Sequence, residues 1–584
     1  MGNRSWVAWL SGLAVLLLAM LLLSPAAQAA EDSQGLNLRW RWVYAPCNFQ
    51  VNERVDELIA LMERARKAGY TGLVVTDYKW GRFADRPKHY YANLDRTQKA
   101  AERAGIELIP CVMPVGYSGS ILMNNPNLAA ALPVRDCVFE VRGGKAVIAD
   151  AADLLPFGDF EQAKGNQPDG WDWVDGPGKS TFRDDKVRHG GQAALRMENF
   201  RQGNEHGNCR LFRKLALEPW HQYHLSVWMR TQDVSNPGDI RAAVLSPDGR
   251  SLNYTGLRAK ATQDWTEHHV VFNPLEHAEV RLYVGIWSGR EGTIWIDDVR
   301  LRPAAGVNLL RRDGCPVKIA GDEGSAFVEG RDFETWQYPK MGRDPWPGAY
   351  KAIHPEPPIV LKAGSRIRQG QRLRVSYWHT QIIYDDQVCC CLSHPELFEH
   401  LEQQVRDVRR FLAPRKYFMS HDEIRIAGWC KLCRAADTPS DPDRTAGQVL
   451  ADNVRRCTEI IHKVDPQAEV FVWSDMFDPH HNARNNYYLV ASTLTGSWDG
   501  LGKDVRVANW NGGHRDASLG FFAARGHKQI IAAYYDSRNW KAELAKWLDA
   551  ARKAGGVEGI IYTTWLGDYS QLEAFAAALP RLDR

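Results

Sequence analysis

Residues 417–425 read YFMSHDEIR, and this stretch decides the fold. The apolar residues 417–419 are typical of a short buried strand, and His421, Asp422 and Glu423 follow directly. Ionisable groups at the end of a buried strand are costly to desolvate, so their presence there indicates a function. In a parallel α/β barrel, the carboxyl ends of the strands carry the active site. We therefore predict that Asp422 and Glu423 are a catalytic pair at the end of a barrel strand.

The two carboxylates are neighbours in the chain, and neighbouring strand residues point to opposite faces. The strand must therefore end or bulge here if both are to reach one ligand. The alternative is that one of them caps the next helix or pairs with Arg425.

The flanking sequence alternates between strands and helices. Apolar strand patterns at 38–44, 71–76 and 107–113 are separated by helical patterns at 55–68 and 94–104, which indicates βαβ units and a parallel sheet. After a long interruption the alternation resumes, with helices at 395–412 and 445–464 and strands at 417–419, 469–473, 505–508, 529–533 and 559–562. Three strands before the interruption and five after it make eight, the number that closes a (β/α)8 TIM barrel.

The interruption has a different texture. Residues 114–152 are predicted to be loop, and 156–303 contain short alternating strands with turn signals between them, which predicts an all-β sandwich. We assign 36–150 and 384–584 to the barrel, 156–303 to the sandwich and 304–383 to a small β extension that returns the chain to the barrel.

The ends of the sandwich segment carry a signature, with FGDFE at 157–161, HGG at 189–191 and IDDV at 296–299. This segment resembles the jelly-roll carbohydrate-binding modules of families 4, 9 and 22. The resemblance implies a structural calcium ion, with Asp159, Glu161 and Asp297 as its oxygen donors. The alternative is that these acids only cap turns.

Residues 1–30 are predicted to be a signal peptide. Arg4 precedes an apolar run over 6–23, and Ala27-Gln-Ala29 provides a small-residue cleavage pattern. An uncleaved anchor is the alternative. We expect an extracellular or periplasmic protein with no contact with the membrane after cleavage.

Composition narrows the class of partner. The net charge of +3 provides no basic footprint, so nucleic acid is not expected as a partner. The 22 Trp and 20 Tyr favour an oligo- or polysaccharide, because flat aromatic faces stack on sugar rings. Among the 11 Cys, residues 389–391 are consecutive, and Cys430 and Cys433 form a CxxC. This CxxC is either a disulfide or half of a zinc site with a Cys of the triplet, and we expect disulfides or free thiols rather than a metal.

Polar and aromatic residues gather where the predicted barrel strands end. Besides the acidic pair, the candidate substrate-binding residues are Asp77, Trp80, His421, Trp473, Asp475, Trp510, Tyr534, Tyr535 and Trp565. Aromatic walls with carboxylates are typical of barrels that cleave sugars.

The order and spacing of these residues resemble glycoside hydrolase family 20, the β-N-acetylhexosaminidases, over roughly half of the chain. Residues 419–423 (MSHDE) correspond to that family's Asp-Glu motif, and 76–80 (TDYKW) to its second strand end. The resemblance implies a substrate-assisted retaining mechanism. Asp422 would orient the substrate's acetamido group, Glu423 would be the general acid and base, Tyr534 or Tyr535 would bind the acetamido oxygen, and no cofactor would be needed for catalysis.

Two further hypotheses remain open. One is a non-catalytic carbohydrate-binding protein on a degenerate hydrolase barrel. The other is a metal-dependent enzyme that modifies polysaccharides and uses His421, Asp475, His480 and His481. The two adjacent histidines lack the i, i+4 spacing of ligands on a helix, so this hypothesis ranks last.

Overall fold

The computed structural model describes residues 36–434 and 444–580. The predicted signal peptide lies outside the described residues. Among the described residues, no helix combines the length and the apolarity needed to span a bilayer.

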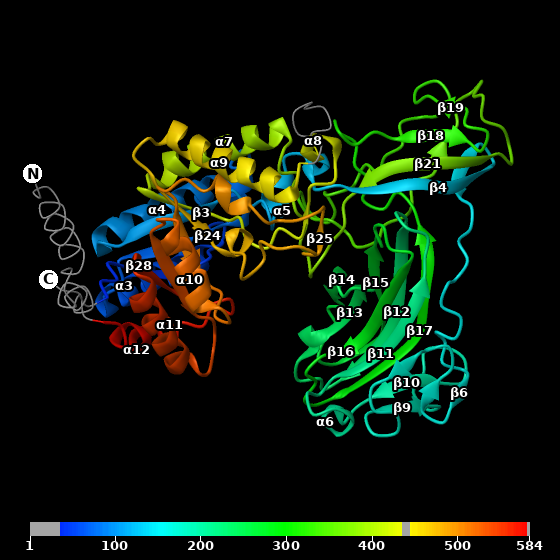
Figure 1. Cartoon of the computed structure of the whole chain (residues 1–584), viewed down its shortest axis with the longest axis horizontal. Coiled ribbons are helices and arrows are strands. Elements are labelled where there is room, and N and C mark those ends of the chain that lie inside the picture. Colours follow the sequence, from blue (N-terminus) through cyan, green and yellow to red (C-terminus); the bar gives the residue numbers. More distant parts are fainter. Residues whose placement is uncertain (1–35, 435–443, 581–584) are drawn as a thin grey trace, which may run out of the picture.

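Eight parallel strands form a closed barrel, so the predicted barrel is confirmed (Figure 1). Three strands precede the insertion and five follow it. In barrel order they are β1 (Trp40–Tyr44), β2 (Gly72–Val75), β3 (Glu107–Val112), β22 (Lys416–Met419), β24 (Glu469–Trp473), β26 (Arg506–Asn509), β27 (Gln529–Tyr534) and β28 (Val557–Thr563). Inward-facing side chains such as Trp42, Ile109, Phe418 and Phe471 fill the interior. The barrel is therefore a packed core, and only its rim can hold a ligand.

The barrel helices are α3 (Asn52–Ala68), α4 (Lys88–Ala104), α7 (Pro395–Leu412), α9 (Ala446–Val464), α10 (Arg515–Ala524), α11 (Trp540–Ala554) and α12 (Leu572–Ala577). Helices α3 and α4 are capped at their C-termini by Gly69 and Gly105, which adopt left-handed conformations. Helix α9 begins with a capping box between Thr445 and Gln448. These capping residues determine where α3 and α4 end and where α9 begins.

The inserted sandwich consists of two five-stranded antiparallel sheets. One has the order β15 (Gln263–Phe272), β12 (Gln222–Gln232), β17 (Thr293–Ala304), β10 (Ala194–Met197), β9 (Thr181–Asp184). The other has the order β14 (Ser251–Gly256), β13 (Ile240–Leu245), β16 (Glu279–Ile286), β11 (Cys209–Ala216), β8 (Trp173–Val174), and its strands β13, β14 and β16 lie on the side of the sandwich nearer the barrel (Figure 1).

A six-stranded antiparallel sheet joins the sandwich to the barrel. Its order is β19 (Ala326–Phe327), β18 (Lys318–Gly321), β21 (Arg372–His379), β4 (Leu132–Arg142), β5 (Lys145–Ile148), β20 (Ile359–Val360). The sequence predicts a loop over 114–152 and assigns 36–150 to the barrel, whereas the structure forms β4 and β5 there and pairs β4 with β21. The reason is that β4 completes a hydrophobic face with residues 305–377, which the local sequence cannot indicate.

The remaining elements are short. They are α5 (Gly119–Leu122), α6 (Phe200–Gly203), α8 (Lys431–Arg434), β6 (Ala163–Lys164), β7 (Gln167–Pro168), β23 (Ile426–Ala427) and β25 (Leu489–Val490), with 3-10 turns η1 (Tyr78–Gly81), η2 (Pro126–Leu128), η3 (Pro237–Asp239), η4 (Asp475–Phe477) and η5 (Ser497–Gly500). Strands β23 and β25 pair with each other just beyond the ends of β22 and β24.

The sandwich packs against loops that leave the barrel mouth. Arg250 donates from Nη2 to the Val490 carbonyl at 2.6 Å, and Trp220 contacts Trp429 edge to face at 5.6 Å between ring centroids. Asn486 donates to Asp248 at 3.1 Å. These contacts hold the sandwich beside the ends of β22 and β24.

Candidate active site at the barrel mouth

The acidic pair lies just beyond the end of β22. The strand ends at Met419, and Glu423 adopts a positive φ of 51°. A non-glycine residue in this region is uncommon and marks a turn or a functional constraint. The strand therefore ends before the pair, as the sequence argument requires.

Glu423 is held from both ends of its carboxylate. Tyr117 donates from its hydroxyl to Oε2 at 2.5 Å, and Arg425 lies 2.8 Å from Oε1. The Glu423 N–H donates to Asp475 Oδ2 at 2.8 Å, and its carbonyl accepts from Gln387 at 2.7 Å. These contacts leave the carboxylate one orientation, which is the preorganisation that acid–base chemistry needs. In the sequence argument, an ion pair with Arg425 was the alternative to a catalytic role. The structure contains this ion pair, and Glu423 nevertheless lies at the barrel mouth.

Asp475 is buried and Asp422 is partly buried beside Glu423. Burial, reinforced by the negative charge of Asp475, raises the pKa of Asp422 to about 7. Burial also raises the pKa of Asp475 to about 7, with a further contribution from Glu423. Each carboxyl also accepts a hydrogen bond from a neutral side chain. Ser420 donates to Asp422 at 2.8 Å, and Asn482 donates to Asp475 at 2.9 Å. Carboxyls that retain a proton near neutral pH can act as acids there.

Aromatic rings surround the three carboxylates. Trp510 donates from Nε1 to Asp475 Oδ1 at 3.3 Å and stacks on Tyr535 with centroids 6.2 Å apart. Trp565 contacts Tyr535 at 5.9 Å and Trp473 at 6.5 Å. Trp565 is 54% exposed, so its ring is open to a ligand. The arrangement is a wall of aromatic faces around acidic groups, which suits a sugar ring.

Tyr535, rather than Tyr534, lies beside the acidic groups. The Tyr535 hydroxyl is buried without a partner among the described residues, and burial near Asp475 and Asp422 raises its pKa well above the ordinary value. Tyr534 instead stacks on Tyr562 at 4.1 Å and donates to Asp568 at 2.8 Å. An unpartnered buried hydroxyl beside the acidic groups is a ready donor for a substrate oxygen.

Three other predicted substrate-binding residues do not join this site. Asp77 accepts from the N–H groups of Phe49 and Lys79, both at 3.0 Å, and so caps η1. Trp80 is buried against Phe49 with centroids 5.8 Å apart. His421 is fully buried and bonds Asn453 at 3.0 Å, and burial lowers its pKa to about 4. Each of these three side chains is therefore held by a structural contact of its own.

The alternative metal set does not converge either. His481 packs edge to face on Trp510 at 4.4 Å, whereas the His480 ring contacts Phe521 at 6.2 Å. In the described chain, the one cluster of three or more possible metal-binding side chains is made of cysteines.

The candidate calcium ligands are partly occupied by backbone donors. Asp297 Oδ2 accepts from His189 and Gly190 at 2.8 and 3.1 Å, and burial raises the pKa of Asp297 to about 6. Glu161 accepts from Gln192 at 2.7 Å, and Asp159 accepts weakly from the Glu161 N–H at 3.5 Å. Calcium binding stays a prediction.

Sequence reasoning missed several residues of the site as candidates for binding: Tyr44, Gln387, Arg425, Asn482 and Tyr487. Tyr44 ends β1 and contacts Trp565 at 5.2 Å, so its position at a strand end was the available signal. The others lie on long loops whose course the sequence does not indicate.

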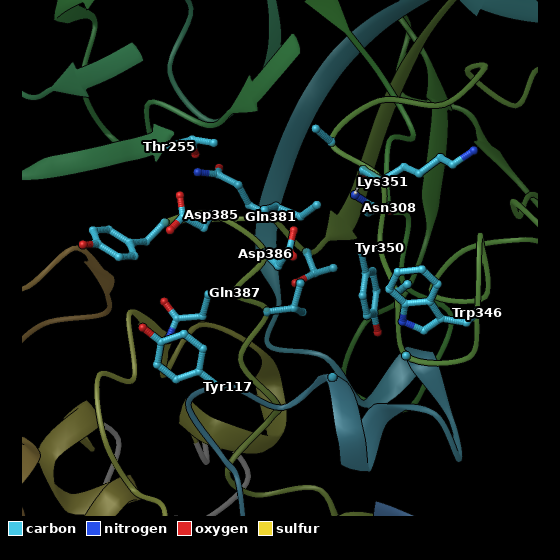
Figure 2. Close-up of a pocket in the computed structure, with 18 of the residues that line it drawn as sticks. Tyr117, Thr255, Asn308, Trp346, Tyr350, Lys351, Gln381, Asp385, Asp386 and Gln387 are labelled. Atoms are coloured by element: carbon cyan, nitrogen blue, oxygen red, sulfur yellow. Dashed lines mark hydrogen bonds between the residues drawn. The ribbon is translucent and has the colours of Figure 1, made fainter. Parts of the chain in front are cut away.

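A cleft of about 1100 Å³ opens beside the site, between the barrel, the sandwich and the connecting segment (Figure 2). Tyr117, Trp346, Tyr350, Asp385 and Gln387 are among its lining residues. Asp422, Glu423 and Asp475 do not line it. Tyr117 and Gln387 connect the two, because both line the cleft and hydrogen-bond Glu423. A ligand in the cleft would thus reach the two residues that position Glu423.

The comparisons with known proteins address the sandwich first. Residues 152–291 match a family model described as a carbohydrate binding domain, CBM_4_9. This match agrees with the predicted resemblance to families 4 and 9. It supports a saccharide as the class of ligand for this part of the chain. The model spans a minority of the chain. No curated protein matches.

Among solved structures, a CBM4 structure is 18% identical, covering 26% of this chain and 99% of its own, with a TM-score of 0.20. A rhamnosidase from Novosphingobium sp. PP1Y is 10% identical, covering 91% of this chain and 55% of its own, with a TM-score of 0.32. An arabinose-bound α-L-arabinofuranosidase is 10% identical and covers 72% of each chain, with a TM-score of 0.22.

Proposed function

We propose that this chain is an exported glycoside hydrolase that cleaves an oligo- or polysaccharide at the barrel mouth. The observation that carries the proposal is the convergence of Asp422, Glu423 and Asp475 within a wall of aromatic rings. Burial and neighbouring negative charge at this rim raise the pKa values of Asp422 and Asp475, which costs stability, so a structural role does not account for the group. Acid-catalysed cleavage of a glycosidic bond does need a proton donor and a second carboxylate.

The residue order favours a hexosaminidase-like reaction. Asp422 would orient the acetamido N–H of the substrate, and the acetamido oxygen would attack the anomeric carbon. Glu423 would protonate the leaving oxygen and then activate water. Tyr535, with its unpartnered hydroxyl, would bind the acetamido oxygen, and Trp473, Trp510 and Trp565 would enclose the ring.

The outward face of one sandwich sheet supports a polymeric substrate. Aromatic and arginine side chains follow one another across strands β8, β11, β16, β13 and β14 and the residue just after β16: Trp173, Arg210, Tyr283, Trp287, Arg241 and Tyr254. We call this set the aromatic path. It ends at Tyr384, which stacks on Tyr254 at 6.2 Å and lies 4.3 Å from the Arg425 guanidinium. Arg425 pairs with Glu423, so a chain bound along the path would arrive at the acidic site.

The test is hydrolysis of chromogenic β-N-acetylglucosaminide and β-N-acetylgalactosaminide, and of the matching oligosaccharides, by wild type and Glu423→Gln. Turnover by wild type that is lost in the variant supports the proposal. Equal turnover by both rejects the role of Glu423. Saccharide binding on a glycan array without turnover of any bound sugar would favour the binding-protein alternative.

A further inference from the structure

A cluster of buried thiols lies behind the acidic site. The Sγ atoms of Cys391, Cys430 and Cys433 all lie within 4.8 Å of one another. Cys391 is 3.6 Å from Cys430 and 3.7 Å from Cys433. A fourth buried thiol, Cys315, directly follows Gly314, whose carbonyl accepts a hydrogen bond from the N–H of Lys431 within the CxxC. Three segments that are distant in sequence thus bring four cysteines together.

The sulfur spacing fits a tetrahedral metal. Zinc binds thiolate at about 2.3 Å, which places two sulfurs of a tetrahedral site about 3.8 Å apart. The separations of 3.6 and 3.7 Å are close to this value. They are well beyond the roughly 2.05 Å of a disulfide bond.

The backbone around the thiols is shaped to hold them. Cys430 and Cys433 stand at the start of α8 with the CxxC spacing of zinc sites. Gly314 has a φ of 77° and packs on Leu432, so that a Cβ at Gly314 would lie 2.8 Å from Leu432 Cγ. The Gly314 carbonyl accepts from the Lys431 N–H at 3.3 Å. The turn before Cys315 is therefore pressed against the CxxC loop.

A cation is directed at the cluster. Arg312 Nη1 lies 3.7 Å from Cys430 Sγ. In the described part of the chain its other contacts are the carbonyls of Asp313 and Ala129, and its buried Nε has no partner. A partly buried guanidinium without a carboxylate partner needs another counter-charge. A divalent metal with four thiolates carries a net charge of −2 and supplies it.

We propose that Cys315, Cys391, Cys430 and Cys433 bind one structural Zn²⁺. Four thiolates close the coordination shell, which is the arrangement of structural rather than catalytic sites. The ion joins three loops: the loop with Cys315 between β17 and β18, the loop with Cys391 between β21 and α7, and the loop after β22. The loop between β21 and α7 also carries Gln387, which donates to the Glu423 carbonyl, so the ion also supports the position of Glu423.

The first test measures metal in the full-length protein purified from zinc-supplemented medium. One zinc per chain by inductively coupled plasma mass spectrometry, and the visible absorption of tetrahedral cobalt thiolate after exchange with Co²⁺, are the expected results. A metal-free protein overturns the proposal, whether its cluster thiols are free or joined in a disulfide found by peptide mass spectrometry.

Variants assign the ligands. Cys391→Ser and Cys433→Ser should lose zinc, and Cys315→Ser should lose zinc or shift the cobalt spectrum, whereas Cys390→Ser should keep one zinc per chain. Cys390 is equally buried but bonds the Val115 carbonyl instead of the cluster. If the ligand variants fail to fold, the wild-type cobalt spectrum still decides. Full zinc content with an unchanged cobalt spectrum in Cys315→Ser would remove Cys315 from the site.

Discussion

The Tyr117 hydroxyl donates a 2.5 Å hydrogen bond to Glu423 Oε2 and accepts one from Arg425 Nη1 at 3.1 Å. One phenol thus links the carboxylate to its counter-ion at the edge of the cleft. Hydrogen bonds to ionised groups contribute about 1.5–3 kcal/mol.

Tyr117→Phe should lower kcat/KM about 10- to 100-fold, because the carboxylate loses that donor. Steady-state kinetics on the substrate found in the first screen measure the effect. Tyr78→Phe is the control, since Tyr78 lines the same cleft but donates to the Pro347 carbonyl. Equal effects of the two variants would show that Tyr117 acts only by lining the cleft.

Leaving-group dependence should separate the roles of the acidic pair. Glu423→Gln should cost about 10²–10⁴-fold with a poor leaving group and much less with an activated aryl group, which departs without protonation. Asp422→Asn should be impaired on both substrates. The reverse pattern would exchange the two roles, with Asp422 as the proton donor. Glu399→Gln, at an exposed position of α7, controls for general effects.

The free energy of unfolding should fall as the pH rises toward neutral because of Asp422 and Asp475. In the folded chain the pKa values of Asp422 and Asp475 are raised to about 7, against about 3.9 when unfolded. Between these values the folded state binds more protons, so the favourable contribution is complete below about pH 4 and is lost as the pH passes about 7.

Denaturant unfolding of wild type and Asp475→Asn from pH 5 to 8 measures this. The wild type should lose more stability over the range, because the asparagine does not titrate. Histidines of lowered pKa, such as His379, are common to both proteins and cancel in the difference. Parallel pH profiles would contradict the raised pKa of Asp475.

Gly116→Ala should displace the acidic loop. A Cβ at Gly116 would lie 1.9 Å from the Asp422 carbonyl oxygen, and backbone cannot yield as a side chain can. We expect a loss of about 1–3 kcal/mol in the free energy of unfolding and a large fall in turnover. Gly520→Ala is the matched control, because its Cβ meets nothing within 4 Å. Normal activity of Gly116→Ala would show that the loop tolerates the shift.

Trp287→Ala and Tyr254→Ala should weaken binding to the polymeric substrate while leaving kcat on a small chromogenic substrate unchanged. Each removes a stacking face from the aromatic path. Pull-down with insoluble polysaccharide measures the affinity, with Trp265→Ala on the opposite sheet as control. Unchanged polymer binding would show that the aromatic path does not bind the polymeric substrate.

The sequence predicts the barrel well because each of its strands is a short apolar run between helix end signals such as Gly69 and Gly105. It does not predict β4 and β5, whose outer partners β21 and β20 lie beyond the sandwich.

At the site, the sequence identifies which strand ends carry polar and aromatic groups but not where each side chain points. Residues 534–536 all have positive φ, so alternation fails there and cannot choose between Tyr534 and Tyr535. Asp77 and Trp80 follow a strand end and are residue types that suit a sugar site. In the structure, however, Asp77 caps a turn and Trp80 packs in the core. The loops that supply Gln387 and Tyr487 depend on long-range packing.

The insertion closes in nested steps. The Leu154 N–H bonds the Leu301 carbonyl at 2.7 Å, so the folded sandwich brings its own ends together. Leu132 then pairs with His379, and Val112 with Met419. Each closure shortens the free loop that the next pairing must bridge, and so reduces its entropic cost. We therefore expect the barrel to depend on the sandwich for assembly: the distant half-barrels meet at low cost only after the inserted units have folded.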